Sequence, residues 1–495
     1  MTGKSRPSIV YLTISVLILG GTLATLAATA SANRSPVWRL VALALGSNIP
    51  YAAALFAAWK ARTRLNTAWP VIATALALRL ILVSSPPVFS DDIYRYVWDA
   101  KVMDSGENPY RFAPDDPTLE PLRDDLWTKI NHKSLRTIYP PLSEMVFFAI
   151  ALVAPHPHGF KIASALADTC VVCLVILIAG GALRGPKKPQ KERNTQETAI
   201  WAGLVYGLNP LACIETGMSG HLDPFAVALT LFALLLLKKN RGIASGFVAG
   251  LGAGIKLAPI LLLPIIARRH RLAWVIPPLL IVALYLPFTS AGLKTVETLD
   301  TFGRRWEGNA GMFALVKGGT QTAIGFAMDA DDKNSIVHLS FLDSLASGLD
   351  GTFFSLHKEG AFDPKRPGSF ALGDLSLAVS KILGLIVIIA TIITVTVRRV
   401  EPVRSAALVF GVLVIISPIM HPWYLLWILP YAAALNIWPW LFLASLSFMA
   451  YLPLDGWWAM GIWEAPPWIP WLEYGFFVLA LIAYLILPRL KKTLL

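Results

Sequence analysis

Apolar runs separated by polar segments follow one another along most of the chain. They cover residues 8–28, 38–59, 68–86, 160–183, 198–217, 222–237, 242–255, 257–267, 272–290, 371–397, 403–420, 423–436, 438–453 and 468–488. The pattern predicts an all-α, polytopic membrane protein of about 14 transmembrane helices, because about 20 apolar residues suffice to cross a bilayer. The runs 242–255 and 257–267 are too short to cross it upright.

Composition and charge agree with a membrane protein. Only 15% of the 495 residues are charged, and the net charge is +12. A soluble domain has about 25% charged residues. Lys and Arg gather in the loops at 60–64, 184–193, 238–241, 268–271, 398–404 and 489–492, as is typical of cytoplasmic loops. The positive charge therefore implies no nucleic-acid partner.

These basic loops can all lie on the same side of the membrane only if the run 138–156 does not cross it. Prolines near both ends of this run favour a re-entrant or interfacial hairpin. The chain then divides into four parts. Residues 1–66 form two extra N-terminal transmembrane helices, 67–290 a transmembrane module with a first outer loop at 87–159, 291–370 a large extracytoplasmic loop, and 371–495 the C-terminal transmembrane helices.

Two adjacent carboxylates, Asp91 and Asp92, stand at the outer end of the run 68–86. A carboxylate beside hydrocarbon is costly unless it is solvated, paired or functional. One interpretation is that the pair caps a helix over 92–104, although Ser90 could cap that helix equally well. The other is general base catalysis, in which one carboxylate takes a proton from an acceptor hydroxyl and the second raises its pKa.

Other polar residues stand at the outer ends of other runs. Lys256 is alone at the tip of an apolar hairpin, where a lysine needs an anion such as phosphate. His221 and Asp223 belong to the turn 219–224, and Asp223 is also a candidate N-cap of the following helix. His421 lies among aromatic residues that suit a membrane interface.

The two large outer loops supply the remaining candidates. His132 and Tyr139 accompany cations before the hairpin, which suits either an anionic lipid head group or solvated surface charge. Arg304, Arg305 and Asn309 lie in the second loop, and planar guanidinium groups match phosphate well. The histidines are scattered, so metal ligation is not indicated.

Six segments together carry a resemblance to a known superfamily. They are "SDDIYRYVWDA", "GENPYRFAPDDP", "INHKSLRTIYPPL", "GHLDPF", the Lys-x-x-Pro at 256–259 and "HPWYLLWILP". They resemble the integral-membrane glycosyltransferases of the GT-C superfamily, and in particular the bacterial polyprenyl-phosphate-mannose-dependent mannosyltransferases. The resemblance covers roughly residues 70 to 490, and the two N-terminal helices precede the usual first helix of that module.

The resemblance implies an inverting glycosyltransferase that moves one sugar, with mannose the favoured sugar, from a polyprenyl-phosphate donor. The acceptor would be a lipid, glycolipid or polysaccharide on the extracytoplasmic face of the plasma (inner) membrane. Asp91 or Asp92 would be the base, and Asp223 would support acceptor placement. Lys256, His421 and Arg304 or Arg305 would stabilise the leaving phosphate. No cofactor is implied, and a divalent cation is compatible but not indicated.

A transporter or flippase of lipid-linked sugars is the alternative. Such proteins commonly contain inverted repeats and carry acids at the membrane midplane. The sequence shows no internal repeat and its acids cluster outside, which favours the transferase. A catalytically inactive scaffold is a third interpretation, and the intact Asp pair argues against it.

Overall fold

The computed structural model describes residues 6–32, 35–61, 67–181, 189–330, 332–338, 369–463 and 465–493. Parts of the basic segment 184–193 and of the second outer loop 291–370 therefore lie outside the described residues. The described chain is helical apart from turns and a small antiparallel pair of strands. The predicted all-α class is confirmed.

The first half of the chain forms helices of very unequal length. They are α1 (Arg6–Ser31), α2 (Val37–Gly46), α3 (Asn48–Ala61), α4 (Trp69–Val83), α5 (Asp92–Asp104), η2 (Pro117–Leu122), α6 (Asp125–Thr128), α7 (Pro141–Ala151), α8 (Pro157–Ala179), α9 (Pro189–Gly207), α10 (Pro210–Gly217), α11 (Asp223–Lys238) and α12 (Gly242–Ile255), where η marks a short 3-10 helix.

The second half adds the two strands and further helices. They are η3 (Ala258–Leu262), α13 (Leu263–Ala267), η4 (Arg271–Trp274), α14 (Ile276–Tyr285), η5 (Leu286–Ala291), α15 (Lys294–Arg305), α16 (Gly311–Met328), β1 (Ile336–His338), β2 (Ser369–Ala371), α18 (Leu372–Val397), α19 (Pro402–Ile415), η7 (Pro422–Trp427), α20 (Leu429–Leu435), α21 (Pro439–Leu446), η8 (Ser447–Tyr451), α22 (Leu454–Met460) and α23 (Trp468–Thr493). Ile336 pairs with Ala371 in the sheet.

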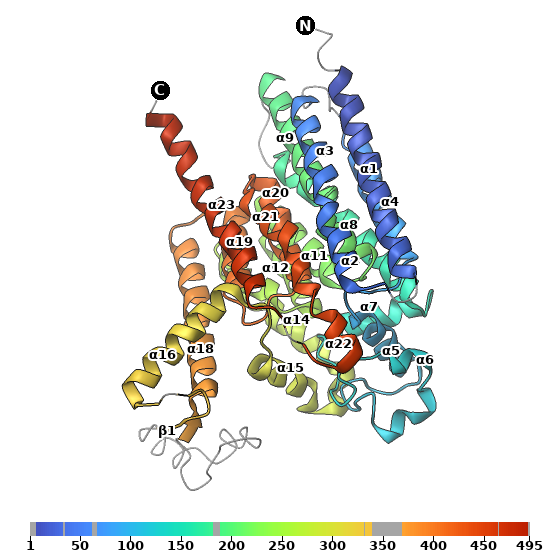
Figure 1. The fold of residues 1–495 in the computed structure, drawn as a ribbon, viewed down its shortest axis with the longest axis vertical. Coiled ribbons are helices and arrows are strands. Elements are labelled where there is room, and N and C mark those ends of the chain that lie inside the picture. The colour runs from blue at the N-terminus through green and yellow to red at the C-terminus, as the bar shows by residue number, and fades with distance from the viewer. Residues whose placement is uncertain are drawn as a thin grey trace.

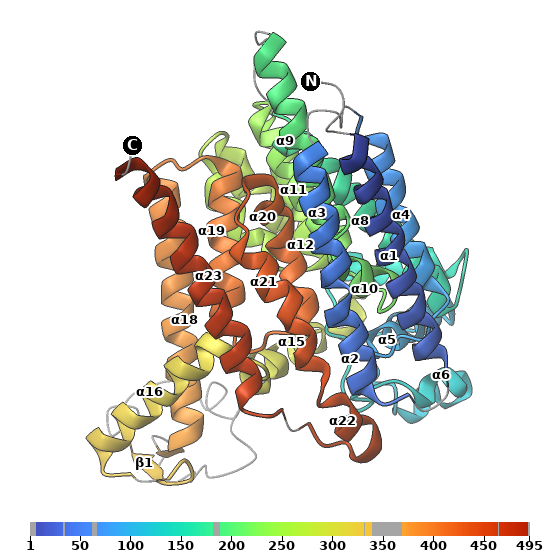
Figure 2. The ribbon, with the colours of Figure 1, turned by 45° about the horizontal axis from the view of Figure 1, so that its top comes forward.

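Both chain termini lie at one end of the molecule (Figure 1). The opposite end, called the distal end below, carries α5, α6, α7, α15 and α22. Figure 2 shows the long helices α1, α8, α18 and α23 running between the two ends. Short helices and loops that precede or follow these long helices at the distal end are thereby brought together.

Six of the described helical segments are long and apolar enough to cross a membrane. They are Pro7–Ser31, Val37–Ala61, Pro157–Ala179, Arg271–Ala291, Leu372–Val397 and Trp468–Leu487. The predicted count of about 14 spans is not confirmed. Proline lacks a backbone N–H and disfavours helix in the residue before it, so the run 198–217 divides at Pro210 into α9 and α10. The run 423–436 divides in the same way near Pro430.

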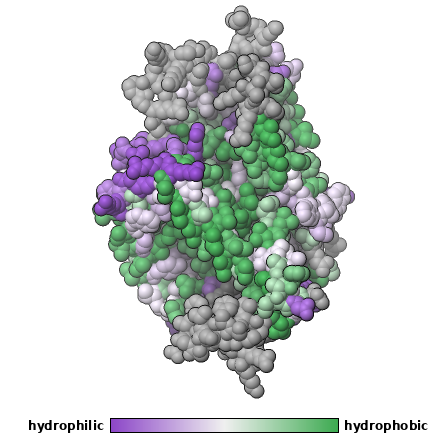
Figure 3. All heavy atoms as spheres, turned by 90° about the vertical axis from the view of Figure 1, so that its left-hand side faces the viewer, coloured by the Kyte–Doolittle hydropathy of each residue, from purple (hydrophilic) through white to green (hydrophobic). Residues whose placement is uncertain are grey.

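Large apolar side chains cover the outside of the bundle. Leu279 on α14, Leu385 on α18 and Leu479 on α23 are 62%, 54% and 64% exposed. Figure 3 shows this apolar surface as a broad band across the middle of one face. An exposed apolar band of this size is expected where lipid covers a helical bundle.

The segment 138–156 contains only α7, which is 11 residues long. At 1.5 Å per residue it spans about 16 Å, well short of the roughly 30 Å of hydrocarbon. Its Phe147 stacks on Tyr96 of α5 with ring centroids 4.6 Å apart, and both helices lie at the distal end. The basic loops can lie on one side of the membrane only if this segment does not cross it, and α7 is too short to cross.

The second outer loop is more regular than its polar sequence suggests. It begins with α15, and α16 follows over Gly311–Met328. The glycines of α16 lower its helix propensity, but the helix packs on α18 and α23. Tertiary packing therefore overrides the weak local signal.

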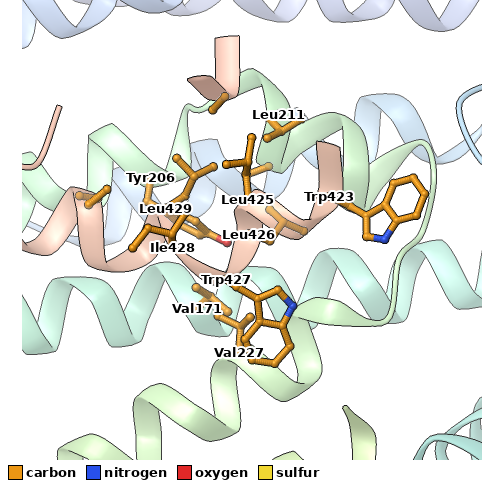
Figure 4. Packing of buried hydrophobic residues seen from close by; sticks show 14 of the residues in the cluster. Val171, Tyr206, Leu211, Val227, Trp423, Leu425, Leu426, Trp427, Ile428 and Leu429 are labelled. Atoms are coloured by element: carbon orange, nitrogen blue, oxygen red, sulfur yellow. The ribbon is translucent and has the colours of Figure 1, made fainter. Parts of the chain in front are cut away.

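The helix η7 crosses the hydrophobic core. Leu425 and Leu426 on η7 are fully buried, and Figure 4 shows them among Val171 of α8, Leu211 of α10 and Val227 of α11. Because the backbone of η7 is held by these contacts, the tryptophans at its two ends are fixed beside the start of α11.

Candidate active site

A cavity of about 740 Å³ lies at the distal end. Its lining comes from within the segments 89–95, 131–140, 256–258, 298–309, 413–427 and 450–463. The residues singled out from the sequence that line it are Asp91, Asp92, His132, Tyr139, Lys256, Asn309 and His421. Segments as far apart in the sequence as 89–95 and 450–463 thus contribute to one concave, mostly apolar site of the kind that binds small molecules.

The acidic pair stands at the start of α5, which begins at Asp92 and ends at Asp104 as predicted. The side chain of Asp91 makes no capping hydrogen bond. Ser90 Oγ instead accepts from the backbone N–H of Asp92 at 3.4 Å. Capping therefore does not account for Asp91, whose Oδ1 accepts a 2.6 Å hydrogen bond from Asn131 Nδ2.

The surroundings of Asp91 favour its protonated form. Burial, and then the neighbouring charge of Asp92, raise the pKa of Asp91 to about 7, against the lowering effect of the Asn131 hydrogen bond. Near neutral pH this carboxyl group therefore exchanges between its acid and base forms. A group poised in this way is suited to general base catalysis.

Asp223 and Lys256 form a buried ion pair beside the acidic pair. Lys256 Nζ donates to both carboxylate oxygens of Asp223, at 3.0 and 2.9 Å. Trp427 Nε1 donates to Asp223 Oδ1 at 2.8 Å, and Figure 4 shows Trp427 projecting from η7 beside the start of α11. Asp223 makes no capping bond with α11. Lys256 is not the isolated lysine that the sequence suggested, although its side chain is 22% exposed and reaches the cavity.

Trp423 on η7 is stacked between two histidines. Its ring centroid lies 4.1 Å from that of His221 and 4.2 Å from that of His421. Burial, followed by the influence of His221, lowers the pKa of His421 to about 3. His421 therefore faces the cavity as a neutral imidazole and not as a cation.

Two predicted residues lie behind the cavity wall and two cannot be placed. His221 and Asp223 are 1% and 0% exposed and do not line the cavity. The backbone of Arg304 and Arg305 ends α15, but their side chains lie outside the described part of the structure.

The segment between α15 and α16 is hydrogen-bonded to the loop that carries His421. Gly308 N–H donates to Pro418 O at 3.1 Å, and Met420 N–H donates to Gly308 O at 2.9 Å. Asn309 has a positive φ of 45° and donates from Nδ2 to Glu473 Oε2 on α23 at 3.0 Å. Asn309 thus anchors the cavity wall to the last helix.

Aromatic side chains, among them Trp306, Trp457 and Tyr139, form part of the cavity lining. The His132 ring lies edge-on to Trp306, with centroids 5.1 Å apart, and 6.2 Å from Trp457. Tyr139 packs edge-on against Tyr96 at 5.1 Å. Flat apolar rings with polar edges can stack on the faces of a sugar.

Sequence reasoning missed several polar residues of this region. Arg95 lines the cavity and donates from Nε to Asp99 at 2.8 and 2.9 Å, while its Nη2 has no hydrogen-bond partner among the described residues. The i, i+4 spacing of Asp91, Arg95 and Asp99 was the available signal. Asn131 and Glu215 gave no local signal, since their partners are distant in the sequence.

Metal-ligand geometry is absent from the part of the chain that the structure describes: no group of three or more His, Cys, Asp or Glu side chains there could hold a metal ion.

Comparison with known proteins gives two matches, both to family models. The model described as "Alpha-(1->6)-mannopyranosyltransferase, N-terminal domain" matches residues 11–271, and the model described as "MptB C-terminal domain" matches residues 370–454. The first match includes α1 to α3, whereas the motif resemblance begins near residue 70. The comparison with curated proteins and that with solved structures each found no match.

Proposed function

The chain belongs to the alpha-(1->6)-mannopyranosyltransferase family, and we propose that it moves a single mannose, with inversion, from a polyprenyl-phosphate donor. The acceptor is a lipid, glycolipid or polysaccharide hydroxyl on the extracytoplasmic face of the plasma membrane. The observation that carries this proposal is the partly buried Asp91 carboxyl, poised near neutral pH in the distal cavity.

The reaction needs a base for the acceptor and stabilisation for the leaving phosphate. Asp91 takes the proton of the acceptor hydroxyl as the acceptor oxygen bonds to C1 of the mannose. The bond from C1 to the phosphate oxygen breaks, and its electron pair leaves with the polyprenyl phosphate. An inverting transfer that produces an α-mannoside requires a β-linked mannosyl phosphate.

Cationic and hydrogen-bonding groups in the cavity suit the leaving phosphate. Lys256 reaches the cavity from its pair with Asp223, and Arg95 lines the cavity with an Nη2 that has no hydrogen-bond partner among the described residues. His421 is a neutral hydrogen-bond donor beside them. Arg304 and Arg305 are the further candidates, because charge that develops on the phosphate is stabilised by fixed cations.

The apolar part of the lining suits the polyprenyl chain. Leu257, Leu299, Phe302 and Leu413 contribute to it. The aromatic part of the lining around Trp306 suits the sugars, with Tyr139 and Asn309 as polar contacts. We assign no cofactor, since the cations named above can stabilise a single phosphate group.

The test is transfer of radiolabelled mannose from β-linked polyprenyl-phosphate-mannose into membrane lipids and mannoside acceptors by the purified protein in lipid nanodiscs. Asp91→Asn should lower kcat/KM by about 10²–10⁴-fold, the usual contribution of a positioned base. Asp92→Asn should do less. Asp104→Asn is the matched control, because Asp104 is an exposed residue on the same helix and should retain full activity.

Wild-type turnover by Asp91→Asn would show that another group is the base. If the wild type moved the intact labelled lipid between leaflets without transferring mannose, the protein would be a flippase instead. Sidedness has its own test. In a variant lacking the three native cysteines, Glu120→Cys at the exposed surface of the first outer loop should react with an impermeant maleimide in intact cells. Labelling only after lysis would place the site on the cytoplasmic side.

A further inference from the structure

His221 lies between two carboxylates behind the cavity wall. Its Nε2 is 3.3 Å from Glu215 Oε2 and its Nδ1 is 3.9 Å from Asp92 Oδ2. His221 is 1% exposed and Glu215 is 0% exposed. Neither ring nitrogen, nor Glu215 Oε2, makes a hydrogen bond with any of the described residues, each other included. Buried polar atoms of this kind are rare without a purpose.

The position of the His221 ring is fixed on every side. Its backbone N–H donates to Glu215 O at 3.0 Å, and its carbonyl accepts from Ser164 Oγ at 2.7 Å. Gly220, with φ of 73°, turns the chain into this position, and a Cβ there would lie 2.7 Å from Ile93. The face of the ring stacks on Trp423. The two nitrogens therefore keep facing the two carboxylates.

Glu215 decides which nitrogen carries the proton. Its Oε1 already accepts a 2.6 Å hydrogen bond from Tyr451 OH, and within the described part of the chain its Oε2 has His221 as its one ionisable neighbour within 4 Å. A fully buried carboxylate needs compensation on both oxygens. A proton on Nε2 supplies it and leaves Nδ1 directed at Asp92.

We propose that Glu215 and His221 form a relay behind the acidic pair, in which Glu215 holds the Nε2–H of His221 and the 29% exposed side chain of Asp92 turns across the present 3.9 Å to share one proton with His221 Nδ1. This inference rests on the proposed function. Sharing that proton removes part of the negative charge of Asp92 from the neighbourhood of Asp91 and so limits the rise in the pKa of Asp91. Asp91 then remains the group that ionises and accepts the acceptor proton, while His221 acts as a positioning residue.

Other charged or titratable groups around His221 are already engaged. Asp223 is paired with Lys256 and Trp427, and His421 lies on the far face of Trp423. Lys161 donates to Ser85 O, and Asp91 is next to Asp92. The open partner for Nδ1 is therefore Asp92.

Two conservative variants separate the two contacts of the ring. In His221→Gln the side-chain amide can still donate to Glu215, but nothing replaces Nδ1. In Glu215→Gln the amide donates to Nε2 and forces the proton onto Nδ1, so Asp92 becomes a full carboxylate, while Tyr451 keeps its acceptor. Each variant should move the acidic limb of the kcat/KM profile to higher pH, by on the order of half to one unit.

The decisive comparison repeats both substitutions in an Asp92→Asn background. In that background the acidic limb of kcat/KM should stay at the pH that Asp92→Asn alone gives it. A relay acts through Asp92, so the effects of its members are not additive with the effect of Asp92→Asn. His156→Asn, at an exposed histidine, should leave the profile unchanged. The relay would be overturned if His221→Gln and Glu215→Gln moved the acidic limb equally with and without Asp92. It would also be overturned if neither substitution moved the limb.

An infrared titration distinguishes failure of the relay from failure of the proposed function. The C=O band of the protonated Asp91 carboxyl is identified by its loss in Asp91→Asn. It should titrate at higher pH in His221→Gln than in the wild type, whether or not mannose is transferred. An unchanged titration would refute the relay even in an active enzyme.

Discussion

The hydrogen bond from Asn131 to Asp91 should set the pH at which the enzyme becomes active. Ionisation of Asp91 is required for it to act as a base, and its pKa of about 7 places the acidic limb of kcat/KM near neutral pH. One unit below that pKa only about a tenth of the carboxyl is ionised, so the wild type should lose about tenfold between its plateau and pH 6.

Asn131→Ala removes the 2.6 Å donor and so destabilises the ionised form. A hydrogen bond to a charged group contributes about 1.5–3 kcal/mol, and water in the cavity replaces part of it. A residual loss of about 1.4 kcal/mol corresponds to a rise of about one unit in the pKa of Asp91. The ionised fraction at pH 7 then falls from about a half to about a tenth. Activity at pH 7 should drop about fivefold, whereas the alkaline plateau should persist.

Asp92→Asn should move the limb in the opposite direction. It removes the neighbouring negative charge that raises the pKa of Asp91, so the variant should keep more activity at low pH. The assay is initial-rate mannose transfer from pH 5 to 9 at limiting donor. Asn334→Ala, at an exposed asparagine, is the control. If Asn131→Ala left the limb in place, or both variants moved it in the same direction, the assignment of Asp91 as the base would fail.

Two further predictions concern buried ion pairs. Arg79 Nε donates to Asp168 Oδ2 at 2.7 Å, and both residues are fully buried. Asp168→Asn should therefore lower the free energy of unfolding by about 3–5 kcal/mol, measured as a lower melting temperature in detergent. Arg241→Met, at an exposed arginine, is the control and should leave the melting temperature unchanged. Lys256→Met and Asp223→Asn should each lower kcat/KM. The double variant should lose less kcat/KM than the product of the two single losses, with a coupling energy of about 1 kcal/mol or more. Full additivity would mean that the pair does not act as a unit.

The sequence was sufficient for those features that depend on local patterns. The bounds of α5 follow from the polar start at Asp92 and were predicted to the residue. The meeting of Asp91, Lys256 and His421 in one cavity followed from assigning their loops to one side of the membrane. Charge distribution along the chain was enough for that assignment.

Contacts between distant segments were not accessible in the same way. Glu215 is hidden in an apolar run, and its partner Tyr451 is 236 residues away. Asn131 stands 40 residues from Asp91. The predicted count of about 14 spans is not confirmed, because apolar composition does not reveal where proline interrupts a helix. His421 was taken for a cation because its burial beneath other segments cannot be read from neighbouring residues.

The two acids at the start of α5 have different surroundings, and these suggest different roles. Asp92 is in the first turn of α5, at the positive end of the helix, and it faces His221. Asp91 precedes the helix, gains no cap, and holds a raised pKa. A base must be able both to take a proton at neutral pH and to release it afterwards, which requires a pKa near that of its surroundings. Asp91 meets that condition because burial and Asp92 raise its pKa while Asn131 limits the rise. Asp92 is thus needed to set the pKa of Asp91, which neither a helix cap nor a single acid would do.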